Sequence, residues 1–311
     1  MDMNNWMSEL KDELKLSEIV MPGSHDATVY KSDTDLKITL LSSQKTTVCH
    51  DDNIYGQCIK GSRFFDIRMK KSGNKVVGYH MAVGQGAKGA TIEKVLDDVD
   101  TFLEENSSEF VILRISHTNS NTKIPKIIAK HDVEERLYKH NPAQNLSKVE
   151  VSDLRSKLIC IYDKGALKIT SSKDGSHPFK KYNSKSKIPV PLNTAGIVTC
   201  GGFSQNPSIE KVKQGQWKKI SEHKKHRKGD HIFVIYWTQT LKKATAMFNA
   251  GSIEGITKHP RTGSHVKIDD LIQKLSRRRK SLPNVIMYDF INVTVSEKIV
   301  NLNAQRQNWE D

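Results

Sequence analysis

The segment RFFDIRM, residues 63–69, has the apolar and aromatic content of a buried β-strand, yet it carries charged side chains. Successive side chains of a strand point to opposite faces, so Phe65 and Ile67 share one face while Asp66 and Arg68 share the other. Burying a charged pair is costly unless the two groups are paired or serve a function. The segment therefore predicts a core strand with either a structural ion pair or a functional site on one face.

Similar short apolar runs, each bounded by Gly, Pro, Asn, Asp or Ser, recur along the chain and predict further buried strands. They are residues 17–21, 76–80, 109–116, 157–162, 196–200, 231–238 and 285–290. Helical patterns separate several of these runs. In residues 91–105 the apolar side chains form one stripe at helical spacing, with acids on the other face. Residues 269–280 and 296–305 also predict helices.

About eight strands alternating with helices in 311 residues predict an α/β fold. We expect one irregular TIM-type (β/α) barrel domain over residues 1–311, with an open doubly wound sheet as the alternative. No GxGxxG motif follows the first strand, which disfavours dinucleotide binding. The serine- and lysine-rich residues 168–188 are interpreted as loop.

The net charge of +14 is unevenly distributed along the chain. Residues 1–155 carry 21 Lys and Arg against 23 Asp and Glu, whereas the remainder carries 28 against 12. Such a basic half predicts attraction to an anionic partner, and an anionic membrane surface and a nucleic acid are the two obvious choices. Few aromatic residues interleave the basic runs, so we expect no nucleic-acid partner.

The cysteines and the chain termini bear on the location of the protein. Four cysteines, Cys49, Cys58, Cys160 and Cys200, fit neither a zinc pattern nor a redox CxxC motif, and we expect buried, unpaired thiols. No run of 18 apolar residues predicts a transmembrane helix, and the N-terminus lacks an ordinary secretory signal. We expect a monomer, cytoplasmic or secreted without such a signal, that acts peripherally on membranes.

Polar residues cluster at the ends of the predicted strands, where a barrel carries its chemistry. Pro22 and Gly23 are interpreted as ending the first strand, so that His25 and Asp26 turn into the barrel mouth, and a later strand ends at His80. Asp289 lies near the end of the last strand. Two histidines, three carboxylates and Arg68 would supply the acid, the base and the cation that phosphodiester cleavage needs.

These runs resemble bacterial phosphatidylinositol-specific phospholipases C of the calcium-independent, X-domain type. The resemblance is carried by WMSELKDELKLSEIVMPGSHDAT (residues 6–28), QCIKGSRFFDIRM (57–69), GYH (78–80), SSEFVILRIS (107–116) and NVIMYDFIN (284–292). It implies cleavage of phosphatidylinositol, or of a phosphorylated or glycosylated inositol lipid, to diacylglycerol and a cyclic inositol phosphate. For a bacterial enzyme of this type, a role as a virulence effector is also conceivable.

The resemblance also implies roles for four of the polar residues. His25 would be the general base that takes the proton from the inositol 2-hydroxyl, which attacks phosphorus. His80 would be the general acid for the leaving glycerol oxygen. Asp289 would orient His25, and Asp26 would support His80.

The same resemblance predicts a reaction without metal ion or cofactor. Arg68 would stabilise charge on the phosphoryl oxygens, and Asp66 would hold the arginine and the attacking hydroxyl in place. The calcium-dependent branch of the family has acids at the positions of Arg68 and Ser116, so this chain supplies its positive charge from the guanidinium instead.

Contacts with the inositol ring are assigned to four residues. Lys164 and Ser116 follow or end strands near the expected mouth, and Tyr236 and Trp237 end a late strand. Three of them have an alternative interpretation, because Lys164 could equally be an exposed surface lysine and the two aromatics could be core residues. Ser116 departs from the lysine that bacterial members often carry near this position.

Two further functions stay open at this point. The first is a catalytically altered module that binds phosphoinositides or membranes, which the basic second half would suit. The second is a metal-dependent phosphodiesterase of the glycerophosphodiester type, although the Glu-rich metal site that it requires is not found near the first strands.

Overall fold

The computed structural model describes residues 1–39, 42–82, 85–116, 123–139, 145–163, 175–181, 197–202, 204, 206–223, 231–241, 251–277 and 282–307. Within these residues eight strands pair in parallel, each with the next along the chain. They are β1 (Met21–Ser24), β3 (Phe64–Ser72), β6 (Val111–Ser116), β7 (Leu158–Asp163), β8 (Ser176–Lys181), β9 (Ile197–Cys200), β10 (His231–Tyr236) and β11 (Val285–Tyr288).

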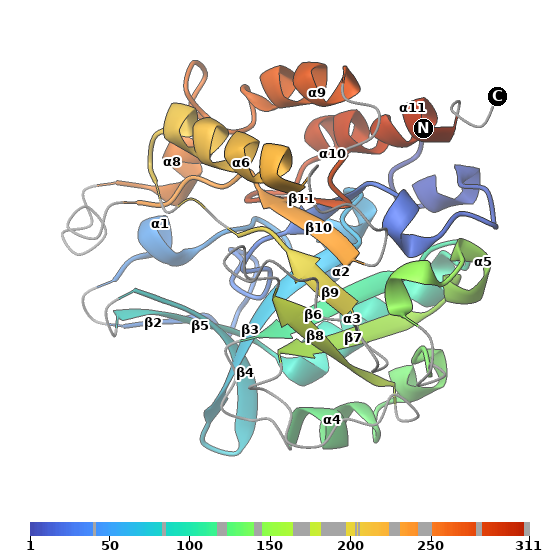
Figure 1. The fold of residues 1–311 in the computed structure, drawn as a ribbon. Helices are drawn as coiled ribbons and strands as arrows, with labels where there is room; N and C mark the ends of the chain where they lie inside the picture. Colours follow the sequence, from blue (N-terminus) through green and yellow to red (C-terminus); the bar gives the residue numbers. More distant parts are fainter. Residues whose placement is uncertain are drawn as a thin grey trace.

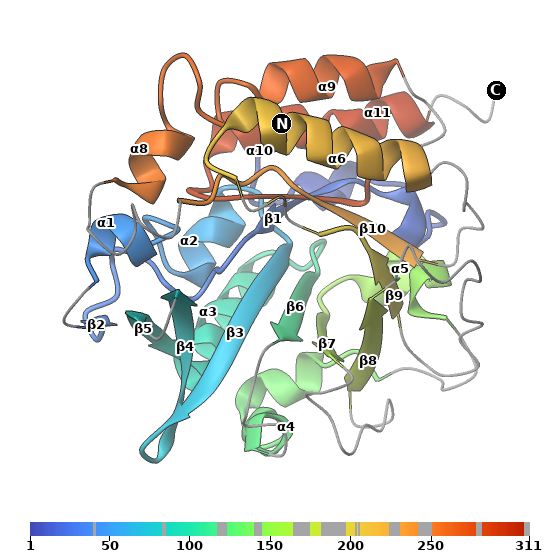
Figure 2. The same cartoon turned by 60° about the vertical axis from the view of Figure 1, so that its left-hand side comes forward.

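The first strand joins the two ends of this run of parallel strands. β1 pairs with β11 along its whole length, and it also pairs with β3 through Gly23↔Phe64 and Ser24↔Phe65. The predicted TIM-type barrel is therefore confirmed, and the doubly wound alternative is wrong, because the strands follow one another around the ring in chain order. Figures 1 and 2 show this ring with its helices outside.

A small antiparallel sheet extends the barrel from β3. β3 pairs with β4 (Lys75–Ala82), β4 with β5 (Gln85–Thr91), and β5 with β2 (Lys37–Ile38), all antiparallel. The prediction of residues 76–80 as a barrel strand is thus wrong, since β4 returns antiparallel alongside β3. This return brings His80, near the end of β4, back toward the barrel.

One barrel strand lies in a segment that the sequence predicts as loop. β8 is rich in Lys and contains Pro178, a composition typical of connections, yet its backbone pairs with both β7 and β9. Backbone pairing with two neighbours outweighs the weak local preference for a strand. The assignment of residues 168–188 to a loop is therefore wrong for β8.

The first strand is also shifted from its predicted position. Residues 16–18 form a 3-10 helix and the strand begins at Met21, so Pro22 and Gly23 lie inside β1 rather than ending it. A Cβ atom at Gly23 would collide with the side chains of Met287 and Val285. Glycine at this position allows β1 to approach β11 closely, and that approach places the residues after β1 beside those after β11.

Helices cover the outside of the barrel. They are α1 (Gln44–Thr47), α2 (Ile54–Ile59), α3 (Ile92–Glu105), α4 (Lys123–Ile128), α5 (Val151–Leu154), α6 (Ile209–His223), α8 (Ile253–Thr257), α9 (Ile268–Ser276), α10 (Val293–Val300) and α11 (Leu302–Gln307). The prediction for residues 91–105 is confirmed, with Thr91 as the N-cap of α3 and the whole apolar stripe buried. The predicted last helix is two helices, α10 and α11.

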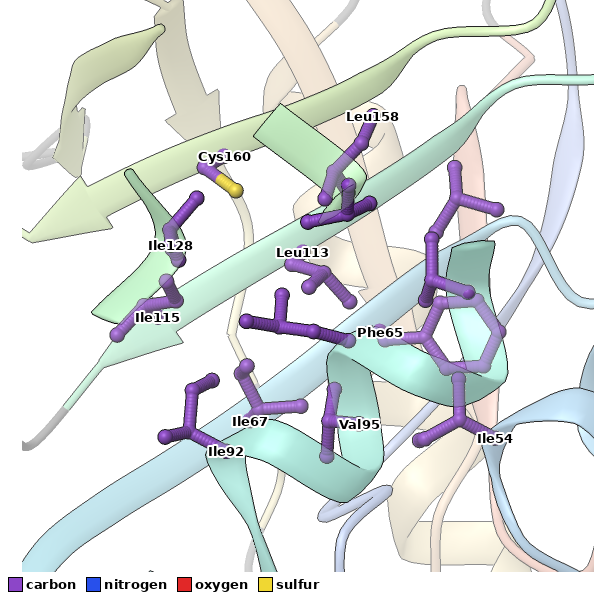
Figure 3. Packing of buried hydrophobic residues seen from close by; sticks show 14 of the residues in the cluster. Ile54, Phe65, Ile67, Ile92, Val95, Leu113, Ile115, Ile128, Leu158 and Cys160 are labelled. Atoms are coloured by element: carbon purple, nitrogen blue, oxygen red, sulfur yellow. The ribbon is translucent and has the colours of Figure 1, made fainter. Parts of the chain in front are cut away.

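Two apolar layers sandwich the wall of the barrel. Inside, Phe64, Ile112 and Met287 belong to a buried cluster that includes Trp6 and Met7 of the N-terminal segment. Outside, a second cluster joins β3, β6 and β7 to α3. Figure 3 shows members of this outer cluster, among them Phe65, Ile67, Ile92, Val95, Leu113 and Ile115.

Candidate active site

The alternation of side chains along β3 places Asp66 and Arg68 on the inner face of the barrel wall. Phe65 and Ile67 pack in the outer cluster, as predicted, so Asp66 and Arg68 occupy the opposite, inner face of β3. Asp66 is 2% exposed, and the Arg68 side chain is 17% exposed, so the mouth holds these charges largely out of water.

His25 and Asp289 form a hydrogen-bonded pair across the β1–β11 junction. Each follows its strand directly, and His25 Nδ1 lies 2.9 Å from Asp289 Oδ1. A carboxylate beside Nδ1 fixes that nitrogen as a donor and directs Nε2 toward the mouth. The predicted pairing of these two residues is present in the structure.

The charge of His25 is determined by its buried neighbours. Burial alone would lower the pKa of His25, but the negative charges of Asp26 and Asp289 outweigh it and raise that pKa to about 9. The raised pKa therefore favours the protonated imidazole at neutral pH.

Asp26 lies between both histidines and the arginine. Its Oδ1 is 2.7 Å from Arg68 Nε, and its Oδ2 is 3.5 Å from His25 Nε2 and 3.6 Å from His80 Nε2. Burial would raise the pKa of Asp26, but Arg68 and the histidines lower it to about 2, so the carboxylate is charged. Its backbone φ of 47° lies in the left-handed region, a strain that is characteristic of functional sites.

The hydrogen bonding of Asp26 is incomplete. Neither of its carboxylate oxygens, nor Arg68 Nε, has a partner in hydrogen-bond geometry within the described part of the chain, although the ion-pair distances are short. A buried carboxylate in this state can accept a hydrogen bond from a substrate hydroxyl.

His80 occupies the other side of the mouth. Its Nδ1 lies 2.8 Å from the carbonyl oxygen of Thr47, which accepts a hydrogen bond from it. That contact fixes the tautomer and presents Nε2 to Asp26. Arg68 Nη2 is 3.4 Å from His25 Nε2, so the guanidinium lies beside the His25 ring.

A second row of polar residues lies beneath Arg68. Arg114 Nη1 contacts Asp66 Oδ1 at 3.2 Å and donates to the Tyr236 hydroxyl at 2.5 Å, and Ser116 Oγ donates to Asp66 Oδ1 at 3.2 Å. Tyr236 also meets the His25 ring edge-on at 5.8 Å. Ser116 and Tyr236 thus lie at the site, where they contact Asp66 and Arg114; their contact with the inositol ring stays a prediction. The alternation of Arg114 with Ser116 along its strand was the available signal for this arginine.

Two predicted substrate residues are not brought to this mouth. Trp237 is 1% exposed, packs in the cluster with α6 and α9 outside the barrel, and donates from its indole nitrogen to the Ser264 carbonyl at 2.8 Å. Its assignment to substrate is wrong, because strand alternation turns it away from Tyr236; it is a core aromatic. Lys164 lies outside the described residues.

The short stretch Cys49–His50 links the turns that follow β1 and β11, and the sequence assigns it no role. His50 Nε2 donates to the His25 carbonyl at 2.8 Å, and the Cys49 carbonyl accepts from the Phe290 amide at 2.7 Å. Burial lowers the pKa of His50 to about 4, so the ring is neutral and keeps an Nδ1 acceptor, which lies 3.5 Å from the Ile291 amide.

Cys49, Cys58 and Cys160 are buried and unpaired, as predicted.

Together these features bring the Nε2 atoms of His25 and His80 to 3.5 and 3.6 Å from one oxygen of Asp26, with the Arg68 guanidinium beside that carboxylate. Groups of these types can supply the base, the acid and the cation for cleavage of a phosphate ester.

Comparison with known proteins shows which proteins this chain resembles. Residues 21–164 match the sequence profile of the phosphatidylinositol-specific phospholipase C X domain. The chain is 33% identical over 117 residues to 1-phosphatidylinositol phosphodiesterase of Listeria monocytogenes, and 30% identical over 144 residues to that of Staphylococcus aureus. These stretches cover 37% and 46% of this chain and 34% and 43% of the relatives, so the chain matches less than half of their length.

The fold similarity extends over the whole chain. The phosphatidylinositol-specific phospholipase C structure from L. monocytogenes has a TM-score of 0.62 and 19% identity, covering 97% of this chain and 98% of that one. A mutant of the S. aureus enzyme has a TM-score of 0.66 and 15% identity, covering 96% and 98%. Over residues 21–164 the chain is thus similar in sequence to the phosphatidylinositol-specific phospholipase C X domain, and its fold is similar to that of the bacterial enzymes with this domain.

Proposed function

We propose that this protein cleaves the phosphodiester bond of an inositol phospholipid through His25 and His80, without a metal ion. The observation that carries the proposal is the pair of histidine Nε2 atoms, 3.5 and 3.6 Å from one oxygen of Asp26, with Arg68 beside them. A phosphate placed against this guanidinium has a proton acceptor on one side and a proton donor on the other.

The reaction proceeds by in-line displacement at phosphorus. His25 Nε2 takes the proton of the inositol 2-hydroxyl as its oxygen bonds to phosphorus. The bond from phosphorus to the glycerol oxygen breaks, and His80 Nε2 gives a proton to that oxygen. The products are a cyclic inositol phosphate and diacylglycerol, and Arg68 stabilises the charge that develops on the phosphoryl oxygens.

The remaining polar residues orient or support His25, His80 and Arg68. Asp289 holds the His25 ring with Nε2 toward the substrate, and Asp26 accepts a hydrogen bond from a substrate hydroxyl while it supports His80. Asp66 is held by Arg114 and Ser116, so it restrains Arg68 from the inner side, 3.7 Å away.

The position of the Arg68 guanidinium disfavours the alternative of a metal-dependent phosphodiesterase. The carboxylates of Asp26 and Asp66 both face Arg68, so a guanidinium occupies the position between them where a hard cation such as calcium would be coordinated. We propose that activity needs neither calcium nor another metal.

The protein would reach its substrate at a membrane surface. Among the described helices none is long and apolar enough to cross a bilayer. Lys211 and Lys218 are exposed on α6, in the basic half of the chain, and would favour an anionic surface. We propose peripheral action on membranes by a monomeric, one-domain protein of bacterial type.

The test is release of water-soluble inositol phosphate from phosphatidylinositol vesicles in excess EDTA. The wild type is expected to turn over, and His25→Ala is expected to lose most of its activity. A matched control is His131→Ala, because His131 also pairs with a carboxylate, Asp97 at 3.0 Å, but lies away from the mouth. Activity that EDTA abolishes would instead favour the metal-dependent class, and binding without turnover would favour a lipid-binding module.

A further inference from the structure

The face of β3 that carries Arg68 continues beyond the barrel mouth. Figure 2 shows the β3–β4 hairpin extending past the ends of the neighbouring barrel strands. Ile67 and Met69 both pack in the outer cluster, so strand alternation places Lys70 and Ser72 on the same inner face as Arg68. Lys70 follows Arg68 by two residues, a distance of about 7 Å along the strand.

The neighbouring strands add two residues to this face. Tyr79 of β4 pairs with Lys88 of β5, and residues paired across adjacent strands point to the same side of the sheet. Lys70 Nζ lies 5.1 Å from the centre of the Tyr79 ring, and Lys88 Nζ donates to Ser72 Oγ at 3.0 Å. These four residues, Lys70, Ser72, Tyr79 and Lys88, form what we call the hairpin face.

The hairpin face is electrostatically continuous with the active site. Burial raises the pKa of Tyr79, and the charge of Arg68 opposes that rise, so the phenol lies within reach of the active-site cation. The Tyr79 hydroxyl is therefore protonated at neutral pH and can donate a hydrogen bond.

The two lysines of the hairpin face repel each other. Lys70 is partly buried, and burial together with the charge of Lys88 lowers its pKa. An anion bound between two such ammonium groups relieves their repulsion. Lysine ammonium groups and a tyrosine hydroxyl are donors that phosphate oxygens accept. The hairpin face therefore has the chemistry of a phosphate-binding subsite beside Arg68.

We propose that Lys70, Lys88 and Tyr79 bind a phosphate monoester carried on the inositol ring, so that the protein prefers a phosphorylated inositol lipid to plain phosphatidylinositol. With the phosphodiester against Arg68, a second phosphate on the same ring would extend along the inner face of β3 toward the lysines. This inference rests on the proposed function, because it names the substrate of the same site. A phosphate of a neighbouring lipid has the same chemistry, and a monomeric substrate separates the two sources.

The preference is measured on short-chain lipids below their critical micelle concentration. The quantity is the ratio of kcat/KM for phosphatidylinositol monophosphates, tested as separate ring isomers, to kcat/KM for phosphatidylinositol. The wild type is expected to prefer at least one phosphorylated isomer, and Lys70→Gln and Lys88→Gln should each lower that ratio about 5- to 10-fold. Lys71→Gln removes the same charge from the exposed, opposite face of β3 and should keep the ratio.

Three results would overturn the subsite. The first is a wild type that prefers no phosphorylated isomer, and the second is an equal fall of the ratio in Lys71→Gln. The third is an unchanged ratio in Lys70→Gln combined with weaker binding to anionic vesicles that lack inositol lipid. That combination would assign the lysines to a membrane surface rather than to the substrate ring.

Binding of soluble headgroups tests the subsite without turnover. Calorimetric titration of the full chain is expected to show tighter binding of glycerophosphoinositol monophosphate than of glycerophosphoinositol, and Lys70→Gln should lose most of that difference. If no variant cleaves any lipid but the difference in affinity remains, the proposed function fails and the subsite stands. Equal affinities of the wild type for the two headgroups would refute the subsite, whatever the turnover.

Discussion

The charge on His25 depends on two carboxylates that reach it from different parts of the barrel. Asp289 contacts its Nδ1 and Asp26 faces its Nε2, and together they overcome the effect of burial on its pKa. The ring must lose its proton before it can act as a base. These carboxylates therefore favour the protonated ring at neutral pH.

The raised pKa of His25 makes the stability of the protein pH-dependent. Because the pKa is raised from 6.5 to about 9, the ring contributes stability fully below pH 6.5 and loses it as pH rises through 9. The loss would be about 3 kcal/mol at most, at 1.36 kcal/mol per pKa unit. Denaturant unfolding below pH 6.5 and above pH 9 measures it. Asp289→Asn should flatten the change, and an equally steep change in that variant would show that another group is responsible.

The same pKa sets the pH dependence of turnover. If neutral His25 is the base, kcat/KM should rise with pH up to about 9 in the wild type. Asp289→Asn removes one of the charges that raise this pKa, so the rise should end at lower pH, with a lower maximal rate because the ring is less well oriented. A rise that ends at the same pH in both proteins would argue against His25 as the titrating base.

At the scale of elements, the stretch Cys49–His50 holds the strand ends that carry the site. Asp26 and Phe290 both have left-handed backbone conformations, with φ of 47° and 54°. His50 binds the His25 carbonyl, and Cys49 binds the Phe290 amide, so one segment braces both strained turns. This arrangement joins distant parts of the chain and is not visible as a local sequence pattern.

His50 provides the test of this bracing role. His50→Ala is expected to lower kcat/KM and stability together, because it leaves the His25 carbonyl without its buried donor, at a cost of about 1–3 kcal/mol. His50→Gln, whose amide can donate from a similar position, should recover most of both. If His50→Ala and His50→Gln lose the same activity, the hydrogen bond to the His25 carbonyl does not position the base.

The elements that the sequence predicts correctly are those whose patterns are local. The apolar stripe of α3 and the alternation of β3 depend only on nearby residues, and both are confirmed. β8 and the register of β1 depend on partner strands that are distant in sequence, so lysine-rich or Pro-Gly-containing runs were misassigned. The meeting of His25, Asp26, Arg68 and Asp289 at the strand ends could be predicted because their spacing follows the motifs of the resemblance, whereas Arg114 and His50 join the site through contacts that only the fold creates.

For the whole molecule, the end of the barrel opposite the site carries a buried ion pair. Arg63 and Glu109 are both 0% exposed, with Arg63 Nη2 2.7 Å from Glu109 Oε2, and the arginine also donates to the carbonyls of Met3 and Asn4. The Met7 amide in turn donates to Glu109 Oε1 at 2.9 Å. The pair thereby ties the N-terminal segment across the bottom of the barrel.

Breaking this pair should destabilise the fold without altering the chemistry. Glu109→Gln leaves the arginine charge buried and uncompensated, and we expect a loss of about 3–5 kcal/mol in the free energy of unfolding. Glu104→Gln, on the exposed face of α3, is the matched control and should change stability little. The rate per folded molecule is expected to stay near that of the wild type. A large loss of turnover at full folding would show that the two ends of the barrel are coupled.

A change of leaving group distinguishes a base at His25 from an acid at His80. In a p-nitrophenyl inositol phosphodiester the leaving group is p-nitrophenolate, a stable anion that needs no proton from an acid. His80→Ala is therefore expected to lose about 10²- to 10⁴-fold on the lipid but to approach the wild-type kcat/KM on the activated substrate, whereas His25→Ala should stay impaired on both. Equal losses for the two variants on both substrates would contradict the assignment.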